Sequence, residues 1–367
     1  MRRIAHIRNL TAAWLLVSII ATATQADAQT FISHSRLSTG NWYRIPVTQT
    51  GVYKLTASDV SALNGVSIAR IALYGAPGGQ LSTQLGDDLP DDLVPAAIEV
   101  ADANGNGIFD NSDYLVFYAE GAGVWRYVSG DQRFEYQPNA YATANYYYLT
   151  VDFSGPATEA SALRVKASSA TSSNQGELTT YTGVAAMHDD KQNPNEGGQA
   201  WMADKFTSSL VERSYELTLP GIQTGTTIMA RYGLASSSSQ KAGFEVKYNS
   251  DARQHQLPSG DSYNTFIETF TPRASSTITL TCTFRPIENN AVGYIDFIEL
   301  NALAPLSYAG GQWTVRNTQR LGTGNRCRFA ASGSGADLKA WDVTNPSQPE
   351  ALTVQNNGNG FTFTAPT

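Results

Sequence analysis

Apolar and polar residues alternate in short runs along most of the chain. In residues 277–284, Ile278, Leu280, Cys282 and Phe284 alternate with four threonines, and similar patterns occur at 42–47 and 51–55. Strict alternation over four to eight residues indicates a half-buried β-strand. The runs are rich in β-branched and aromatic residues and are separated by Gly, Asn, Asp, Ser and Pro, as expected for strands and turns. The pattern therefore predicts an all-β protein.

The spacing of these runs predicts three β-rich regions. Strands are expected at 68–74, 114–118 and 146–151 in the first region, and at 210–219, 226–234, 244–248, 265–270 and 292–300 in the second. The second series is typical of a β-sandwich or jelly roll. The predicted organisation is an N-terminal β domain at 29–153, a flexible polar linker at 154–180, a sandwich at 181–303 and a further β segment at 304–367. Only residues 56–63 favour one or two helical turns.

The first 28 residues have the three parts of a secretory signal peptide. Three arginines precede an apolar stretch at 10–23, and small side chains at Ala26 and Ala28 follow it. This order predicts cleavage before Gln29 and export through the inner membrane. No later apolar run has membrane-spanning length, so we expect no direct membrane span.

The charge of the exported protein argues against nucleic acid as a partner. The full chain has a formal charge of −7, and removing Arg2, Arg3, Arg8 and Asp27 with the signal peptide leaves −9. No cluster of Lys and Arg reverses this charge locally, so the surface is expected to repel a phosphate backbone.

The two cysteines are predicted to be structural. Cys282 and Cys327 each share the parity of apolar neighbours in an alternating strand, which places both on the core side. In an oxidising compartment they are either bonded to each other or both buried. A reactive thiolate needs an exposed, electropositive site with a base nearby. We therefore predict no catalytic residue in this chain.

The strongest local motif is a stretch rich in oxygen-bearing side chains at 102–113. Counted from Asp102, oxygen ligands fall at positions 1, 3, 5, 7, 9 and 12, with Gly107 at position 6. The candidate ligands are Asp102, Asn104, Asn106, the backbone carbonyl of Ile108, Asp110 and Asp113. This is the spacing of a twelve-residue calcium loop, so a structural calcium ion is the predicted cofactor. The alternative is a β-hairpin whose Asn-Gly pairs supply the positive φ of a tight turn.

The remaining polar motifs favour solvated loops. His188 precedes two aspartates and Lys191, but no Cys or second His stands close enough for zinc-ligand spacing, so a solvated loop is expected there. No pair of histidines has that spacing anywhere in the chain.

Several stretches together resemble a known family. They are TGNWYRI at 39–45, TGVYKL at 50–55, IALYG at 71–75, NGIFDNSDYLVFYAEG at 106–121, NYYYL at 145–149, GYIDFIELN at 293–301 and AWDVTNP at 340–346. In sequence and order they resemble the pre-catalytic region of PorU-type sortases of the type IX secretion system, which are gingipain-type cysteine peptidases. The resemblance covers almost the whole exported chain.

The resemblance implies a role without implying any catalytic residue here. In that family a peptidase domain with a Cys nucleophile and a His base follows this region, cuts C-terminal sorting signals from cargo and attaches the cargo to the cell surface. It implies cargo proteins and an outer-membrane β-barrel as partners, with the protein at the cell surface, and we expect this chain to stop before the peptidase domain. The alternative is a secreted adhesin or carbohydrate-binding sandwich, whose candidate sugar platforms are Trp42, Trp125, Trp201, Trp313 and Trp341.

Overall fold

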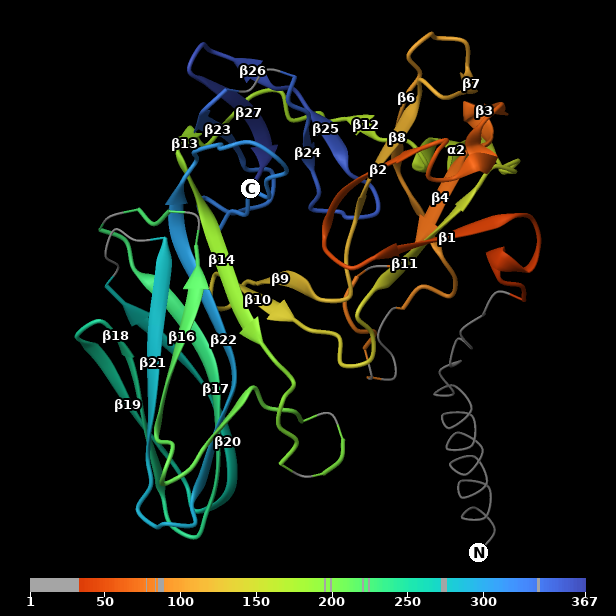
Figure 1. Ribbon diagram of the computed structural model, residues 1–367. Coiled ribbons are helices and arrows are strands. Elements are labelled where there is room, and N and C mark those ends of the chain that lie inside the picture. The colour runs from red at the N-terminus through yellow and green to blue at the C-terminus, as the bar shows by residue number, and fades with distance from the viewer. Residues whose placement is uncertain are drawn as a thin grey trace, which may run out of the picture. The chain divides into compact units, whose positions relative to one another are not determined.

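The structure, a computed structural model, confirms the all-β prediction (Figure 1). It describes residues 33–76, 78–82, 84, 89–194, 196–198, 200–219, 221–223, 225–271, 276–334 and 337–367. Strands account for 50% of the described residues and helices for 5%. The predicted signal peptide at 1–28 lies outside the described residues. The 3-10 helix η1 (Arg36–Ser38) belongs to a separate unit that ends at Ser38, and all other described elements belong to the unit Thr39–Thr367.

The N-terminal β region consists of two antiparallel sheets and a short ribbon around one core. The first sheet has the order β1 (Trp42–Val47), β11 (Asn145–Thr150), β4 (Ala72–Gly75) and β5 (Val94–Ala96). The second has the order β2 (Gly51–Thr56), β8 (Tyr114–Ala119) and β6 (Ile98–Ala101), and the ribbon pairs β3 (Val66–Ser67) with β7 (Ile108–Phe109). Val47, Leu73 and Leu149 of the first sheet are fully buried with Ile98 and Phe117 of the second. Burying such side chains stabilises the fold by about 1.5–3 kcal/mol each.

Residues 56–63 are less helical than the sequence predicts. Only η2 (Ser61–Leu63) is helical there, as a single 3-10 turn, and a similar turn, η3 (Ile68–Arg70), follows β3. The carboxylate of Asp59 accepts hydrogen bonds from the hydroxyl (2.7 Å) and the backbone N–H (2.9 Å) of Thr56. These bonds lower the pKa of Asp59. They also hold the backbone in a turn that competes with an α-helix.

A two-stranded hairpin leaves the N-terminal region. Its strands are β9 (Val124–Val128) and β10 (Arg133–Gln137), which pair antiparallel. Gln132, in the turn between them, has a φ of 50°. Residues of β10 contact β22 of the sandwich, so the hairpin links the N-terminal region to the next one.

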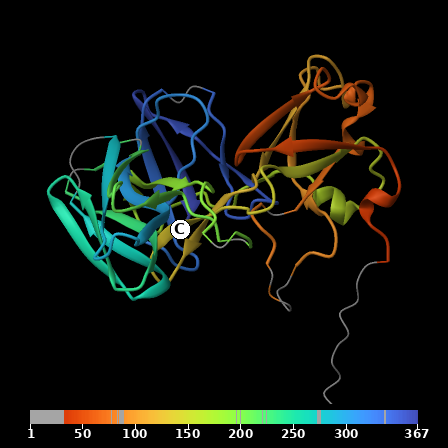
Figure 2. The same cartoon turned by 60° about the horizontal axis from the view of Figure 1, so that its bottom comes forward.

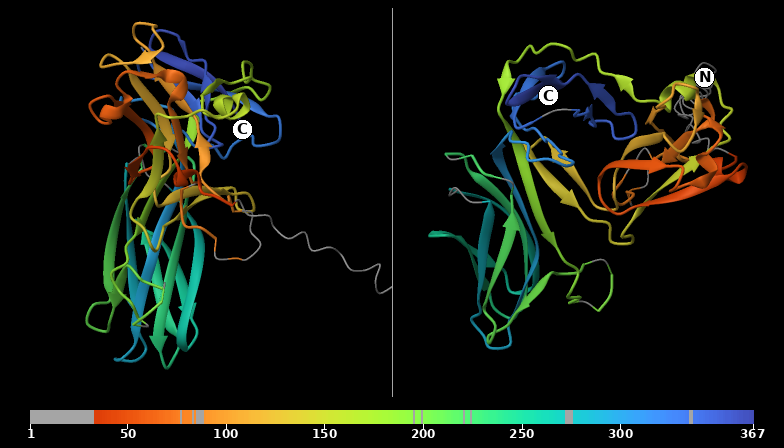
Figure 3. Two further views of the ribbon diagram at one scale, coloured as in Figure 1. Left: turned by 90° about the vertical axis from the view of Figure 1, so that its right-hand side faces the viewer. Right: turned by 45° about the horizontal axis from the view of Figure 1, so that its top comes forward.

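The predicted sandwich is present, with two antiparallel layers (Figures 1 and 2). One layer has the order β14 (Thr180–His188), β22 (Val292–Pro305), β17 (Ile228–Ser238) and β20 (Gly260–Phe270), and β15 (Asp204–Phe206) also pairs with β22. The other has the order β16 (Glu212–Thr218), β21 (Thr277–Arg285), β18 (Ala242–Tyr248) and β19 (Asp251–Leu257). Tyr232, Phe244 and Phe284 are fully buried between the layers. The long strands run side by side in Figure 3 (left).

The C-terminal region adds two small sheets. One has the order β13 (Glu177–Leu178), β23 (Arg326–Ser332), β27 (Gly360–Pro366) and β26 (Gln355–Asn356). The other has the order β12 (Lys166–Ala167), β25 (Glu350–Leu352) and β24 (Ala340–Asp342). Its core contains Leu178, Cys327, Phe329 and Phe361, together with Ala304 near the end of β22. Strand β22 therefore contributes to two cores and joins the sandwich to the C-terminal region.

The segment 154–180 is more ordered than the predicted flexible linker. It contains helix α2 (Ala157–Ala162) and the strands β12 and β13, which pair in parallel with β25 and β23. Figure 3 (right) shows this yellow-green segment running from α2 to β13. Its strands pair with residues more than 140 positions away, so their partners cannot be identified from the local sequence.

Candidate functional site

Neither cysteine can serve as a nucleophile in this fold. Cys282 on β21 is 1% exposed in the sandwich core, and Cys327 on β23 is fully buried in the C-terminal core. The two are not bonded to each other. Burial raises the pKa of the Cys282 thiol, which disfavours the reactive thiolate. The predicted burial of both thiols is confirmed.

In the predicted calcium loop, Asp102 binds the backbone of its own turn. Its Oδ1 accepts a hydrogen bond from the N–H of Gly105 and its Oδ2 one from the N–H of Gly107, both at 2.8 Å. Both glycines have positive φ, at 71° and 75°. A side chain with a Cβ is strained in this conformation, so the two glycines permit the tight turn.

Asp113 has a similar role at the other end of the loop. It is 2% exposed, and its two carboxylate oxygens accept hydrogen bonds from the N–H groups of Ala103 and Asp110, both at 2.8 Å. Asp110 in turn accepts bonds from the hydroxyl (2.6 Å) and the N–H (2.7 Å) of Ser112. Together with a bond from Asn104, these bonds lower the pKa of Asp110. The carboxylates of Asp110 and Asp113 therefore act as acceptors for otherwise unpaired N–H groups.

The other candidate ligands complete the same turn. Asn104 Oδ1 accepts from the N–H of Asn106, and Asn106 Oδ1 accepts from the N–H of Ile108. Across the described residues, no three His, Cys, Asp or Glu side chains converge closely enough to hold a metal ion. The geometry thus explains the aspartates as supports of a tight turn, and calcium binding by this loop remains a prediction.

The five candidate tryptophans do not form one exposed surface. Trp201 is the most open, with 40% of its surface exposed. Trp42 packs against Tyr74, Trp125 against Tyr136, and Trp313 against Tyr181, each with ring centroids less than 6 Å apart. Trp341 is half-buried in β24. Most of these rings therefore contribute to packing between elements.

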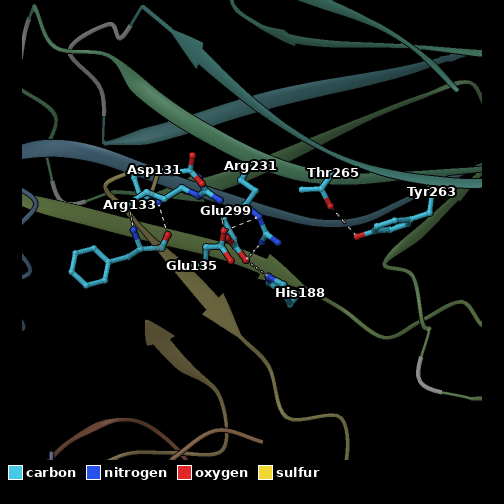
Figure 4. A network of polar contacts seen from close by, with 10 residues as sticks. Asp131, Arg133, Glu135, His188, Arg231, Tyr263, Thr265 and Glu299 are labelled. Carbon is cyan, nitrogen blue, oxygen red and sulfur yellow. Dashed lines mark hydrogen bonds and ion pairs between the residues drawn. The ribbon is translucent and has the colours of Figure 1, made fainter. Parts of the chain in front are cut away.

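A buried polar cluster fixes the β9–β10 hairpin on the sandwich (Figure 4). The side-chain amide of Asn301, on β22, donates to the carbonyl of Phe134 and accepts from its N–H, both at 2.8 Å. Asn301 is 7% exposed. Its amide therefore pairs with the hairpin backbone as a neighbouring strand would.

Charged groups surround this amide pair. Arg133 forms ion pairs with Asp131 and Glu135 of the hairpin. Glu135 lies 3.4 Å from Arg231 of β17, and Nη1 of Arg231 donates to Glu299 Oε1 at 3.0 Å. The chain of charges thus runs from the hairpin into the sandwich (Figure 4).

Glu299 and His188 are at the inner end of this cluster. Glu299 is fully buried, and its Oε1 also lies 2.9 Å from Nε2 of His188, while its Oε2 has no partner among the described residues. The ring of His188 stacks on Phe297, with centroids 4.8 Å apart and planes 2° from parallel. His188 is the last residue of β14, so the interpretation of its surroundings as a solvated loop was wrong.

The sequence of β22 contains a signal for this cluster. Residues 293–301 are apolar at positions of both parities, which is typical of a strand covered on both faces. A Glu and an Asn in such a strand must find buried partners. The identity of those partners, Arg231 and the hairpin, depends on the tertiary structure.

A cavity of about 870 Å³ lies beside the cluster. Its lining includes His188, Arg231, Tyr263, Asp296 and the exposed Trp201. The Tyr263 hydroxyl donates to Asp296 Oδ2 at 2.8 Å. Burial raises the pKa of Asp296 and raises that of Tyr263 to about 12. The cavity combines aromatic rings with several carboxyl groups, and no cysteine is among the described residues that line it.

The comparisons with known proteins show the fold. No family model matches the chain, and no curated protein matches it. Among solved structures it is similar to dimeric latent PorU from Porphyromonas gingivalis, with a TM-score of 0.73 and 21% sequence identity. The match covers 90% of this chain but only 31% of that chain. The protein therefore has a PorU-like fold over a region that corresponds to less than a third of PorU.

Two carbohydrate-binding modules also match in part. They are CBM36 in complex with calcium and xylotriose, with 16% identity over 26% of this chain and 77% of that one, and TmCBM61 in complex with β-1,4-galactotriose, with 15% identity over 34% and 88%. Both have a TM-score of 0.20, which is too low to support an argument. Within the described residues, no helix is long and apolar enough to cross a membrane.

Proposed function

We propose that this chain is the non-catalytic N-terminal region of a PorU-like sortase of the type IX secretion system. The observation that carries the proposal is the similarity to PorU over 90% of the chain at a TM-score of 0.73. The sequence stretches that resemble the family occur in the same order along the chain. The parent protein would cleave C-terminal sorting signals from secreted cargo and attach the cargo to the cell surface.

The chain itself would support and position the peptidase. Both cysteines are buried, and neither thiol is hydrogen-bonded to a histidine in the part of the chain that the structure describes. A cysteine peptidase needs such a pair. In this proposal the protein is exported and remains at the cell surface, and its partners are the cargo proteins and an outer-membrane β-barrel.

Side-chain amides that join distant regions are consistent with a supporting role. Asn301 holds the hairpin on the sandwich, as described above. Gln312 of the C-terminal region accepts a hydrogen bond from the N–H of Val52 on β2 at 2.8 Å. Such side chains restrict movement between regions because each hydrogen bond contributes about 0.5–1.5 kcal/mol. A calcium ion in the loop 102–113 would further stabilise the N-terminal region.

A secreted carbohydrate-binding protein is the second candidate. It is favoured by Trp201, which is exposed at the cavity of about 870 Å³ where Tyr263 and Asp296 supply polar groups. An aromatic face beside hydrogen-bonding groups suits a sugar ring. Under this hypothesis, soluble oligosaccharides bind the purified chain, and Trp201→Ala abolishes that binding while leaving the melting temperature unchanged.

Two experiments test the first proposal. The purified chain should not cleave peptides that contain a sorting signal, and turnover abolished by a thiol-blocking reagent would contradict the non-catalytic role. In the cells that produce the protein, deletion of the codons for residues 29–367 should leave cargo with its sorting signal attached. Normal cargo processing in that strain, with the altered protein absent from the surface, would overturn the proposed role.

A further inference from the structure

A second cavity lies on another side of the β9–β10 hairpin, and its lining includes Phe134. Its volume is about 1150 Å³. The N-terminal region contributes Tyr118 and Trp125 to its lining, and the C-terminal region contributes Trp313, Arg316 and Trp341. Three tryptophans and Arg316, from distant parts of the chain, therefore line one space. Ligand cavities commonly combine apolar walls with a few polar groups of this kind.

Arg316 brings a positive charge to this cavity without a protein anion to balance it. Its guanidinium carbon lies 5.9 Å from the ring centroid of Trp125 and 6.0 Å from that of Phe134. Its guanidinium forms no hydrogen bond or ion pair with any residue that the structure describes. Its backbone is fixed, because the N–H of Thr182 donates to its carbonyl at 2.7 Å. Arg316 is half-buried, and burial lowers the pKa of its guanidinium.

The acidic residues of the lining do not neutralise Arg316. Glu120 forms an ion pair with Arg126 and accepts a hydrogen bond from the N–H of Gly78. Asp342 accepts bonds from the N–H and the hydroxyl of Thr344, at 3.0 and 2.7 Å. Glu350, the third acid of the lining, is exposed to solvent.

Two further donors belong to the same lining. Tyr118 is 9% exposed, and its hydroxyl forms no hydrogen bond with a described residue. Burial, together with the charge of Glu120, raises the pKa of Tyr118 to about 12, so the hydroxyl keeps its proton at neutral pH. The Nε of Arg326 is buried and also has no partner among the described residues. A buried donor such as the Nε of Arg326 is costly unless an acceptor meets it.

We propose that this cavity binds an organic anion, whose carboxylate or phosphate group meets the guanidinium of Arg316 and the hydroxyl of Tyr118. The flat apolar body of the ligand lies against the rings of Trp125, Trp313 and Trp341. A guanidinium presents paired N–H groups that match two oxygens of a carboxylate or phosphate. The site would be a second binding function of the chain, and it does not depend on the role in sorting proposed above.

Calorimetric titration with three small probes tests this site. The probes are 2-naphthoate, 2-naphthyl phosphate and the neutral 2-naphthylmethanol, which share one aromatic body. Both anions should bind the full chain measurably at millimolar concentration and at least about tenfold more tightly than the alcohol, because a hydrogen bond to a charged group contributes about 1.5–3 kcal/mol. The preference between the two anions identifies the acidic group that the site recognises. Equal binding of the alcohol, or no binding of either anion at 10 mM, would overturn the proposal.

Variants assign the effect to Arg316. Arg316→Gln should weaken binding of the anions about tenfold to a hundredfold and leave the alcohol unchanged. Arg316→Lys keeps the charge but loses the paired donors, so its affinity for the anions should lie between that of the wild type and that of Arg316→Gln. The matched control is Arg285→Gln, which removes an arginine that pairs with Glu245 away from the cavity. Equal losses in the Gln variants at 316 and 285 would refute a specific site.

Protein stability separates binding from packing. If Arg316 serves the fold only through its contacts with aromatic rings, then Arg316→Gln should lower the melting temperature of the unliganded chain. If Arg316 serves a ligand, the variant should melt at the same temperature or higher, because a half-buried charge without a protein anion has been removed. A lower melting temperature combined with undiminished anion binding would therefore contradict the proposal.

Discussion

Replacing Asn301 by Ala should release the β9–β10 hairpin from the sandwich. Phe134 pairs with Tyr127 across the hairpin, yet its own N–H and carbonyl both bond to the Asn301 amide. In an antiparallel pair, a residue whose backbone groups point away from the partner strand needs another acceptor and donor. Asn301 supplies both, so the variant leaves two backbone groups of Phe134 without their protein partners.

The magnitude follows from the number of bonds. Each hydrogen bond contributes about 0.5–1.5 kcal/mol, so two bonds contribute about 1–3 kcal/mol. Removing a side chain that is 7% exposed also opens a small space beside the backbone of Phe134, which adds to the loss. If the hairpin opens locally, a loss of this size should accelerate exchange of the Phe134 amide proton about fivefold to more than a hundredfold.

Hydrogen exchange measured residue by residue, together with urea unfolding, checks this prediction. Asn290→Ala removes an exposed amide from a loop and is the matched control, which should change stability by less than about 0.5 kcal/mol. In the Asn301 variant, faster exchange should be confined to the hairpin and the adjoining part of β22. An unchanged exchange rate at Phe134, or equal effects in the two variants, would refute the reasoning.

Three further predictions concern other parts of the fold. A Cβ on Gly293 would lie 2.7–2.9 Å from two buried phenylalanine rings, so Gly293→Ala should cost about 1–3 kcal/mol in urea unfolding. Gly130→Ala, where the Cβ meets nothing within 4 Å, is its control, and similar losses in both would contradict the packing argument. Burial lowers the pKa of His255 from its ordinary value of 6.5, so below that pH the unfolded state binds a proton more readily than the folded state does. Stability should therefore be full above pH 6.5 and fall as the pH is lowered, and an identical pH profile for His255→Gln would disprove this cause. If calcium binds the loop 102–113, then at 100 times its Kd it should add about 2.7 kcal/mol of stability and raise the melting temperature. The double variant Asp102→Asn, Asp113→Asn should not show that response. If millimolar calcium does not change the melting temperature of the wild type, the loop does not bind calcium and serves only as a turn.

The sequence predicted most strands of the sandwich because their periodicity is local. Residues 277–284 alternate strictly, and β21 follows that pattern with Cys282 on the buried face. Strand β19 was missed. Its residues Asp251 to Leu257 are almost all polar, and it lies at the edge of its sheet, where little apolar surface is buried. Strand β19 is held mainly by backbone pairing with its neighbour β18. Backbone pairing, unlike burial of side chains, leaves no pattern in the local sequence.

The candidate site was less predictable because it depends on contacts between distant residues. The oxygen-bearing side chains of 102–113 were identified, but their spacing suits both a calcium loop and a turn that is supported by aspartate-to-backbone bonds. The cluster of Glu299, Arg231 and His188 combines three strands, and the unpaired Arg316 faces a cavity formed by both ends of the chain. The partners of these side chains come from distant parts of the sequence, so only the tertiary structure shows which side chains are paired and which are not.

The most direct test of the proposed function is to measure by mass spectrometry whether secreted cargo still carries its C-terminal sorting signal. In a strain whose gene lacks the codons for residues 29–367, the sorting signal should still be attached to the cargo. Restoring the complete gene should restore cleavage. Uncleaved cargo should predominate in the deletion strain and be scarce in the restored strain. Complete removal of the signal from cargo in both strains would contradict the claim that this chain supports a sortase.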